Sequence, residues 1–245
     1  MSELRTPNSE LRTPNAPISQ QLALMQLADS FFPTGSFTLS HGLESMVQMG
    51  KVKSKDELQI FLELLLLYKI GTTDVVALIH SHRSLNHQED ITALKQIDRQ
   101  LYIQTAIAKY RETQRQSGRA LLMVAQATWQ DERLEILQQE VSQGKMYCLH
   151  PVIFGTVSAI AGLSTENAVL AFLHGLVTSI LSAAIRLSVL GHLQAQQVLL
   201  HLAPIMEQVW VTASGMNLEQ MWSGTPSIDM AQMHHENLDQ RLFSN

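Results

Sequence analysis

The residues best placed for chemistry are His41 and Glu44, at the end of the segment Asp29–Glu44. If both lie on a helix, they are one turn apart and share a face, which would let an imidazole and a carboxylate act on the same proton. No nucleophile or cofactor motif accompanies them, since GxSxG, HExxH and GxxxxGK[ST] are all absent. An enzyme that uses this pair as acid and base is therefore one hypothesis, and a purely structural corner is the alternative.

The structural alternative rests on the residues between Asp29 and Glu44. Pro33-Thr-Gly35 predicts a sharp break between a short helix and a second helix that begins near Ser40. Such a corner would pack aromatic side chains into the core, namely Phe31, Phe32 and Phe37.

Ten histidines raise the hypothesis of a metal site. His80 and His82 are two positions apart on a predicted helix, where side chains point about 200° apart and cannot chelate one ion together, although a frayed helix end could do so with His87. His234 and His235 are adjacent and offer a weak site at most. The alternative is a scatter of surface and hydrogen-bonded core histidines. We expect no intrinsic metal site of high affinity and no intrinsic cofactor.

Composition narrows the classes of function. Of 245 residues, 45% are hydrophobic, which can fill a sizeable core. Seventeen basic against twenty-two acidic residues give a net charge of −5 with no basic run, which argues against nucleic-acid binding. The single cysteine, Cys148, excludes an internal disulfide and is best explained as a small buried residue. With no secretory signal pattern, a cytoplasmic protein is expected.

Periodicity predicts helices throughout. Ser54 and Glu57 form a capping box that opens a helix through about Ile70, and this helix is apolar on nearly every side, as expected of a central buried helix. One-sided stripes at helical spacing predict two further helices, through Ile91, Leu94, Ile97, Leu101, Thr105 and Ala108, and through Leu121, Leu122, Ala125, Thr128 and Trp129.

The stretch from Ala168 to Leu190 is long enough to cross a bilayer, but its polar residues and Arg186 favour a helix buried in protein. Ser164 caps its start, and Gly191 is a plausible stop signal. Arg186 is the only charge in the stretch, so it should have a carboxylate or carbonyl partner, or face water or a subunit contact. Small residues and Arg186 form a stripe suited to close helix packing, through Gly175, Ser179, Ser182, Ala183 and Arg186.

Together these features predict an all-α fold with a single domain of roughly ten helices. Residues 1–19 form a flexible tail that contains a tandem heptapeptide, Ser2–Asn8 and Ser9–Asn15. Residues 20–222 form the helical domain. Residues 223–245 form a C-terminal tail in which Asp229 caps a short helix.

Five segments, taken in order, resemble the urease accessory protein UreF family. The first is LMQLADSFFPTGSFTLSHGLE, which is similar to the opening signature of that family. The others are Arg111–Thr113 with Gly118–Leu122, His150–Gly155, Ala183–Gly191 with Gln194–Gln196, and His235–Ser244. The resemblance covers roughly Leu22 to Ser244. Arg186 stands where some relatives carry lysine, and the position of His41 varies among them.

The resemblance implies an all-α homodimer that hydrolyses nothing itself. Such a protein bridges UreD (UreH in some organisms) and the GTPase UreG, docks on apo-urease and supports GTP-dependent nickel insertion. Nickel would then be handled by the assembled complex, with no membrane and no nucleic acid involved. A helical nickel-storage or membrane-associated protein is a further alternative.

Two regions are predicted to contact partners. Glu44, on a face shared with His41, would take part in GTPase coupling at a UreG-facing surface. The tail from Asp229 to Asn245 is too short and loosely striped for a stable helix alone, so a partner would order it. By the resemblance as well as by chemistry, its contacts would be Arg241, Leu242 and Phe243.

Overall fold

The computed structural model describes residues 17–29, 32, 39–87, 91–235 and 242–243. Within these ranges the chain is helical and contains no strand, so the predicted all-α class is confirmed. The helices, in chain order, are α1 (Pro17–Ala28), α2 (Leu43–Gln48), α3 (Lys55–Leu65), the π-helix η2 (Leu66–Ile70), α4 (Asp74–His87), α5 (Ile91–Gln104), α6 (Ala108–Thr128), α7 (Glu132–Ser142), α8 (His150–Ile160), α9 (Thr165–Arg186), α10 (His192–His201), α11 (Ala203–Ser214), the 3-10 helix η3 (Leu218–Gln220) and α12 (Pro226–His234).

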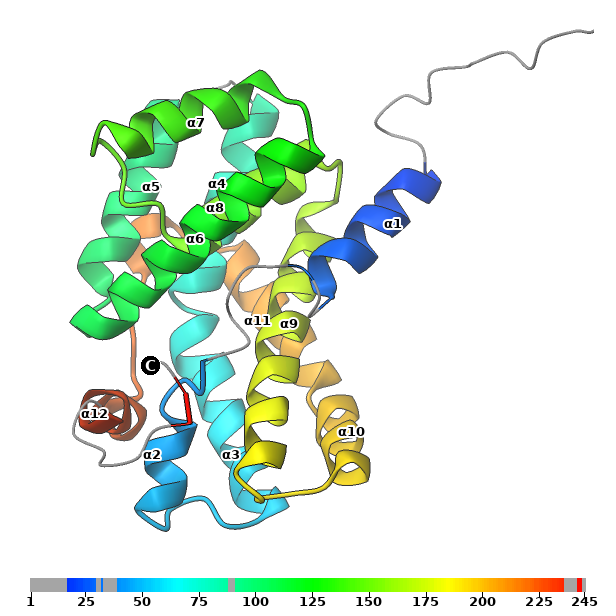
Figure 1. Cartoon of the computed structure of the whole chain (residues 1–245), viewed down its shortest axis with the longest axis vertical. Coiled ribbons are helices and arrows are strands. Elements are labelled where there is room, and N and C mark those ends of the chain that lie inside the picture. The colour runs from blue at the N-terminus through cyan, green and yellow to red at the C-terminus, as the bar shows by residue number, and fades with distance from the viewer. Residues whose placement is uncertain (1–16, 30–31, 33–38, 88–90, 236–241, 244–245) are drawn as a thin grey trace, which may run out of the picture.

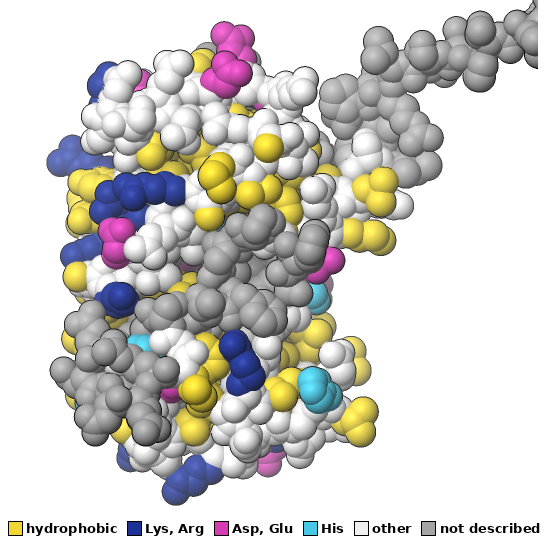
Figure 2. All heavy atoms as spheres, in the orientation of Figure 1, with side chains coloured by type: hydrophobic (Ala, Val, Ile, Leu, Met, Phe, Trp, Pro, Cys, Tyr) yellow, Lys and Arg dark blue, Asp and Glu magenta, His cyan; other side chains and the backbone are white. Residues whose placement is uncertain are grey.

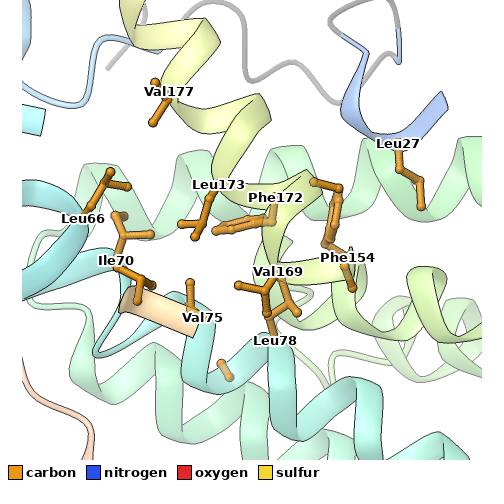
Figure 3. Packing of buried hydrophobic residues seen from close by; sticks show 14 of the residues in the cluster. Leu27, Leu66, Ile70, Val75, Leu78, Phe154, Val169, Phe172, Leu173 and Val177 are labelled. Atoms are coloured by element: carbon orange, nitrogen blue, oxygen red, sulfur yellow. The ribbon is translucent and has the colours of Figure 1, made fainter. Parts of the chain in front are cut away.

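The core is centred on α4, which packs most extensively against α8, while α6 covers the other side of α8 (Figure 1). Figure 3 shows side chains from α4, α8 and α9 meeting in this core, among them Val75, Phe154 and Phe172. The helices approach so closely that a Cβ on Gly155 would lie 2.4 Å from the carbonyl oxygen of Leu78. Only glycine fits at such a contact.

The helix after Ser54 forms as predicted, with one change in its cap. The Ser54 hydroxyl accepts a hydrogen bond from the Glu57 N–H at 3.3 Å, but the Glu57 carboxylate accepts from the Lys53 N–H at 2.7 Å. The expectation that this helix is buried on nearly every side is wrong, because Ile60 is 56% and Leu64 44% exposed. One face of α3 therefore lies on the surface of the described structure.

The stripe that begins at Ile91 does not form one continuous helix. Helix α5 ends at Gln104 and α6 begins at Ala108, so the prediction that carried the first helix through Ala108 is wrong. The Arg111 side chain donates hydrogen bonds to the carbonyl oxygens of Thr105 (2.6 Å) and Ala106 (3.3 Å). These bonds satisfy carbonyls that an uninterrupted helix would pair internally, and so they stabilise the break.

Helix α9 is the one helix in the described ranges that is long and apolar enough to cross a membrane, and 67% of its most apolar window is buried inside the fold. It packs against α1, α8 and α11, among other helices, as expected of a core helix. The Ser164 hydroxyl caps its start by accepting from the Asn167 N–H at 3.1 Å. The predicted stop at Gly191 is wrong: α9 ends at Arg186, Ser188 takes the left-handed conformation (φ 59°), and Gly191 instead precedes α10.

The C-terminal segment packs on the rest of the fold. Helix α12 begins at Pro226, so Asp229 lies in its first turn rather than at its cap. Ile228 and Ala231 are buried, and the helix lies against α2, whose sequence is almost 200 residues away (Figure 1). Residues 226–235 and 242–243 thus have a surface to pack on within their own chain, and the ordering of the tail from Asp229 to Asn245 by a partner stays a prediction.

Candidate functional site

Glu44 is the point at which the C-terminal segment is attached to the body of the protein. Its side chain is buried, at 1% exposure. One carboxylate oxygen pairs with Nε2 of His235 at 2.8 Å, and the other accepts a hydrogen bond from the Leu242 N–H at 2.7 Å. Since a carboxylate accepts hydrogen bonds, Nε2 must carry the proton in this pair. Glu44 is therefore buried within its own chain rather than exposed, and its role in GTPase coupling at a UreG-facing surface stays a prediction.

The turn before α2 holds Glu44 in this position. His41 and Gly42 both have positive φ angles, of 52° and 89°, and Glu44 follows in the first helical turn. A Cβ on Gly42 would lie 2.9 Å from the side chain of Gln232 on α12, and the amide of Gln232 donates to the carbonyl oxygen of His41 at 3.1 Å. The left-handed turn thus brings α2 and α12 into direct contact.

His41 and Glu44 do not form the proposed acid–base pair. The ring of His41 packs edge-on against Tyr110, with 5.7 Å between centroids, and its Nδ1 atom is buried without a hydrogen-bond partner in the described structure. The partner of Glu44 is instead His235. Burial, assisted by the nearby charge of Lys69, lowers the pKa of His41 to about 3, so this imidazole is neutral at physiological pH.

A second attachment point is Lys69, on the π-helix η2. The Gly71 N–H bonds to the carbonyl oxygen of Leu66 at 2.8 Å, the i→i+5 pattern of a π-helix, which occurs often at functional sites. Lys69 points inward and donates to Asp229 at 2.5 Å and to Gln232 at 2.8 Å, both on α12. A buried lysine requires such partners, because an unpaired charge in the interior costs several kcal/mol.

Asp74, at the start of α4, lies next to Lys69 in the same buried network. Its carboxylate accepts hydrogen bonds from Thr73 (2.7 Å), Gln114 (2.5 Å) and Tyr110 (3.4 Å). Burial raises the pKa of Asp74 despite these bonds and the charge of Lys69. The same burial and the neighbouring Asp74 raise the pKa of Tyr110 well above its usual value.

Beside this network is a cavity of about 80 Å³ whose walls are mostly apolar and include several polar side chains. His41, Gln114 and His150 are among the residues that line it. Each of these three side chains has a buried atom without a hydrogen-bond partner in the described structure, which is usual where ordered water is bound. Burial lowers the pKa of His150 to about 4, so both imidazoles that line the cavity are neutral at physiological pH.

The third attachment point joins α9 to the end of the chain. The guanidinium of Arg186 lies over the ring of Phe243, at 4.3 Å from the centroid. Arg186 is the last residue of α9 and is exposed, so the argument that it sits at a costly interior position is wrong. The aromatic ring is a contact that the sequence argument did not name, and the predicted carboxylate, carbonyl or subunit contact stays a prediction. A positive charge at this helix end also complements the helix dipole.

The predicted contacts of the tail separate into three groups. Phe243 is 5% exposed and is packed into its own fold, so it is not a free apolar anchor for a partner. Leu242 is 68% exposed and keeps its side chain available. Arg241 lies outside the described residues.

The histidines considered as metal ligands have other contacts. Nε2 of His80 pairs with the carbonyl oxygen of Met216 and Nε2 of His82 with that of Leu163, each at 2.9 Å. His235 is buried against Glu44, whereas His234 is exposed. Among the described residues no group of three or more histidine, cysteine, aspartate or glutamate side chains is arranged to hold a metal ion.

Cys148 is fully buried, as predicted, and burial raises the pKa of its thiol to about 12. The backbone around it is anchored by Asp98, whose carboxylate accepts hydrogen bonds from the N–H groups of Tyr147, Cys148 and Leu149. The cysteine is thus an inert structural residue. The aromatic corner is confirmed for Phe32, which is buried 6.2 Å from the ring of Trp129, while Phe31 and Phe37 lie outside the described residues.

Sequence reasoning missed Lys69, Asp74 and His235 as site residues. The sequence does contain one signal for Lys69 and one for His235. Lys69 is the single basic residue in an otherwise apolar run, and Asp229, Gln232 and His235 recur at spacings of three, which places them on one side of a helix.

Comparison with known proteins shows the family of the chain. The sequence profile of the UreF family matches residues 52–203. The chain belongs to the UreF family. It is 64% identical over 228 residues to the urease accessory protein UreF of Trichodesmium erythraeum (strain IMS101), a comparison that covers 93% of this chain and 98% of the relative.

More distant members of the UreF family match over a similar length. The urease accessory protein UreF of Bradyrhizobium sp. (strain BTAi1 / ATCC BAA-1182) is 31% identical over 223 residues, covering 90% of each chain. That of Bacillus sp. (strain TB-90) is 26% identical over 226 residues, covering 92% of this chain and 99% of the relative. The chain is therefore a urease accessory protein, and its buried network belongs to a protein of urease maturation.

Proposed function

We propose that this protein is a non-enzymatic scaffold that bridges UreD (or UreH) and the GTPase UreG and supports GTP-dependent insertion of nickel into apo-urease. Membership of the UreF family carries the proposal, because the relatives it matches along nearly their whole length are urease accessory proteins. In this proposal the chain works as a homodimer in the cytoplasm, has no intrinsic cofactor, and leaves nickel to the assembled complex.

The three attachment points support a role in coupling. Glu44, Lys69 and Arg186 lie on α2, η2 and α9, and each contacts the C-terminal segment. A partner that contacts this segment would therefore act on three elements at once, through residues whose contacts are short and mostly buried. This is the physical basis on which we assign coupling to Glu44 and Arg186.

The outer side of the C-terminal segment supports a role in binding. Met230 and Met233 on α12 are 69% and 51% exposed, and Leu242 is 68% exposed. Exposed methionines are flexible and polarizable, and they are common at protein-binding surfaces. In this proposal Leu242 contacts a partner directly, and the guanidinium of Arg241 donates two hydrogen bonds to a partner carboxylate. Phe243 holds the segment in place from within the fold.

The test is co-purification of the chain with UreD and UreG, followed by measurement of urease activation in the presence of nickel and GTP. The full chain should assemble and activate. A variant with Met230→Ser and Met233→Ser should stay folded and lose assembly, whereas Leu22→Ser, which also removes an exposed apolar side chain (60% exposed) from another helix, should not. Activation by a chain that assembles with neither protein would refute the scaffold proposal.

A further inference from the structure

The basic residues of this acidic protein are concentrated in one region. Between Lys95 and Arg119 there are six of the seventeen basic residues and two of the twenty-two acidic ones. This stretch covers most of α5 and the first half of α6. Figure 2 shows dark blue side chains gathered on the left part of the visible face, where Figure 1 places these two helices.

Helical spacing aligns these charges into two stripes. Lys95 and Arg99 are four residues apart on α5, and Tyr102 follows three residues later on the same side. On α6 the stripe consists of arginines at successive spacings of four, namely Arg111, Arg115 and Arg119.

Two stacked tyrosines join the stripes into one surface. The rings of Tyr102 and Tyr147 stack at 3.8 Å with 6° between their planes. The guanidinium of Arg111 lies 4.9 Å from the centroid of Tyr102, and Nε of Arg115 donates to the carbonyl oxygen of Tyr147 at 3.3 Å. We call Lys95, Arg99, Tyr102, Arg111, Arg115, Arg119 and Tyr147 the basic surface.

The acidic side chains near this surface are already paired or buried. Asp98 is fully buried and accepts three backbone hydrogen bonds. Glu112 pairs with Arg115 at 2.8 Å, and Glu140 pairs with Lys95. Arg99 and Arg119 are exposed, so the surface carries a positive charge that the neighbouring carboxylates do not balance.

We propose that the basic surface binds an acidic, amphipathic segment of a partner protein. The exposed arginines supply planar donors suited to carboxylates. Ile103 and Met123, on the same two helices, are 62% and 65% exposed and supply apolar contacts. This inference rests on the proposed function for the identity of the partner, which would be another protein of urease maturation.

A nucleic acid fits this surface less well. The whole chain carries a net charge of −5, which repels a polyanion at long range, and Glu112 and Glu140 lie within the patch. A short acidic protein segment engages local charge and apolar groups together, and it avoids most of this repulsion.

The test uses the isolated full chain and a synthetic helical peptide with glutamates on one face and leucines on the other, followed by fluorescence anisotropy at low and high salt. Arg99→Glu and Arg119→Glu should each weaken binding about fivefold, the upper range for one exposed charge pair, and high salt should weaken it further. Both positions are exposed, so thermal unfolding of the variants should match that of the wild type.

The matched control is Lys51→Glu, which makes the same change of charge at an exposed position between α2 and α3 and should leave peptide binding unchanged. An equal loss in Lys51→Glu, a failure of the wild-type chain to bind the peptide, or tighter binding to duplex DNA would each overturn the proposal. Failure of the scaffold proposal would be seen separately, as a lack of assembly with UreD and UreG by a chain that still binds the peptide.

Discussion

Glu44 and His235 form a buried hydrogen bond of 2.8 Å between positions 191 residues apart. Both side chains are almost completely enclosed, at 1% and 2% exposure. The second carboxylate oxygen of Glu44 binds the backbone of Leu242, so one residue near the start of the fold fixes two points of the C-terminal segment. The strength of this contact follows from its enclosure, because nearby water can replace neither hydrogen bond.

We expect Glu44→Ala to lower the free energy of unfolding by about 3 kcal/mol, since it leaves His235 and a backbone N–H buried without an acceptor. A carboxylate at an exposed position would instead be removable at little cost. Urea unfolding measures the loss, and hydrogen exchange of the Leu242 amide should become faster in the variant.

The matched control is Glu63→Ala. Glu63 also pairs with a histidine, His201, at 3.0 Å, but both side chains are partly exposed. Surface pairs of this kind contribute less than about 1 kcal/mol. Equal losses in the two variants would show that burial of Glu44 is not what makes its pair strong.

Arg186 and Phe243 provide a second test of how the chain end is held. We expect Arg186→Ala to loosen the contact by about 1 kcal/mol and Arg186→Lys by less, because lysine keeps the charge at the end of α9 and a weaker interaction with the ring. Hydrogen exchange of Leu242 and Phe243 measures the effect. If hydrogen exchange of Leu242 and Phe243 is the same in both variants as in the wild type, the contact of 4.3 Å between the guanidinium and the ring has no energetic role.

Local features of the fold were predictable from the sequence. The serine caps at Ser54 and Ser164 form with the residues three positions later, and the class is all-α because periodic apolar stripes recur along the chain. These features depend on neighbours within one or two turns, so one sequence contains all that is needed to infer them.

The candidate site was predictable only in part, because its contacts are non-local. Glu44 and Phe243 were recognised as notable, but the direction of Glu44 into the interior depends on His235, far along the chain. Lys69 and Asp229 are 160 residues apart, and nothing near either position specifies the other. Helical periodicity assigns a face to each residue but does not say which distant helix covers that face.

A pH-dependent prediction follows from His150. Burial lowers its pKa from the usual 6.5 to about 4, so the unfolded chain binds a proton at a higher pH than the folded one. The stability due to neutral His150 is therefore present above pH 6.5 and is lost as the pH falls toward 4. Phenylalanine cannot take up this proton, and it fits the site because His150 already lies 5.8 Å from the rings of Phe154 and Phe172.

Between pH 7.5 and pH 4.5, we expect the free energy of unfolding to fall by about 2 kcal/mol less in His150→Phe than in the wild type. This value is below that of the full pKa shift, because pH 4.5 lies above the folded-state pKa of about 4. Urea unfolding at both pH values measures this difference. Asp74 and Asp98, whose raised pKa values act in the opposite direction, are present in both proteins and cancel. The exposed His192, changed to Gln, serves as control, and an identical pH response of wild type and His150→Phe would contradict the assignment.

The last prediction compares two glycines on core helices. A Cβ on Gly118 would lie 1.9 Å from the carbonyl oxygen of Cys148, a backbone atom held in place by the Asp98 hydrogen bonds, so the helix and this segment cannot both keep their positions. A Cβ on Gly175 of α9 would meet no atom within 4 Å. We expect Gly118→Ala to destabilise the fold by more than about 3 kcal/mol and Gly175→Ala to stabilise it by about 0.5–1 kcal/mol, since alanine restricts the unfolded chain and favours helix. Thermal unfolding of each variant measures both effects.

The Gly175→Ala variant also distinguishes packing within one chain from packing between two chains. If it raises the unfolding temperature but weakens self-association in analytical ultracentrifugation, a second copy approaches α9 at that position. If self-association is unchanged, the small-residue stripe acts only within the monomer.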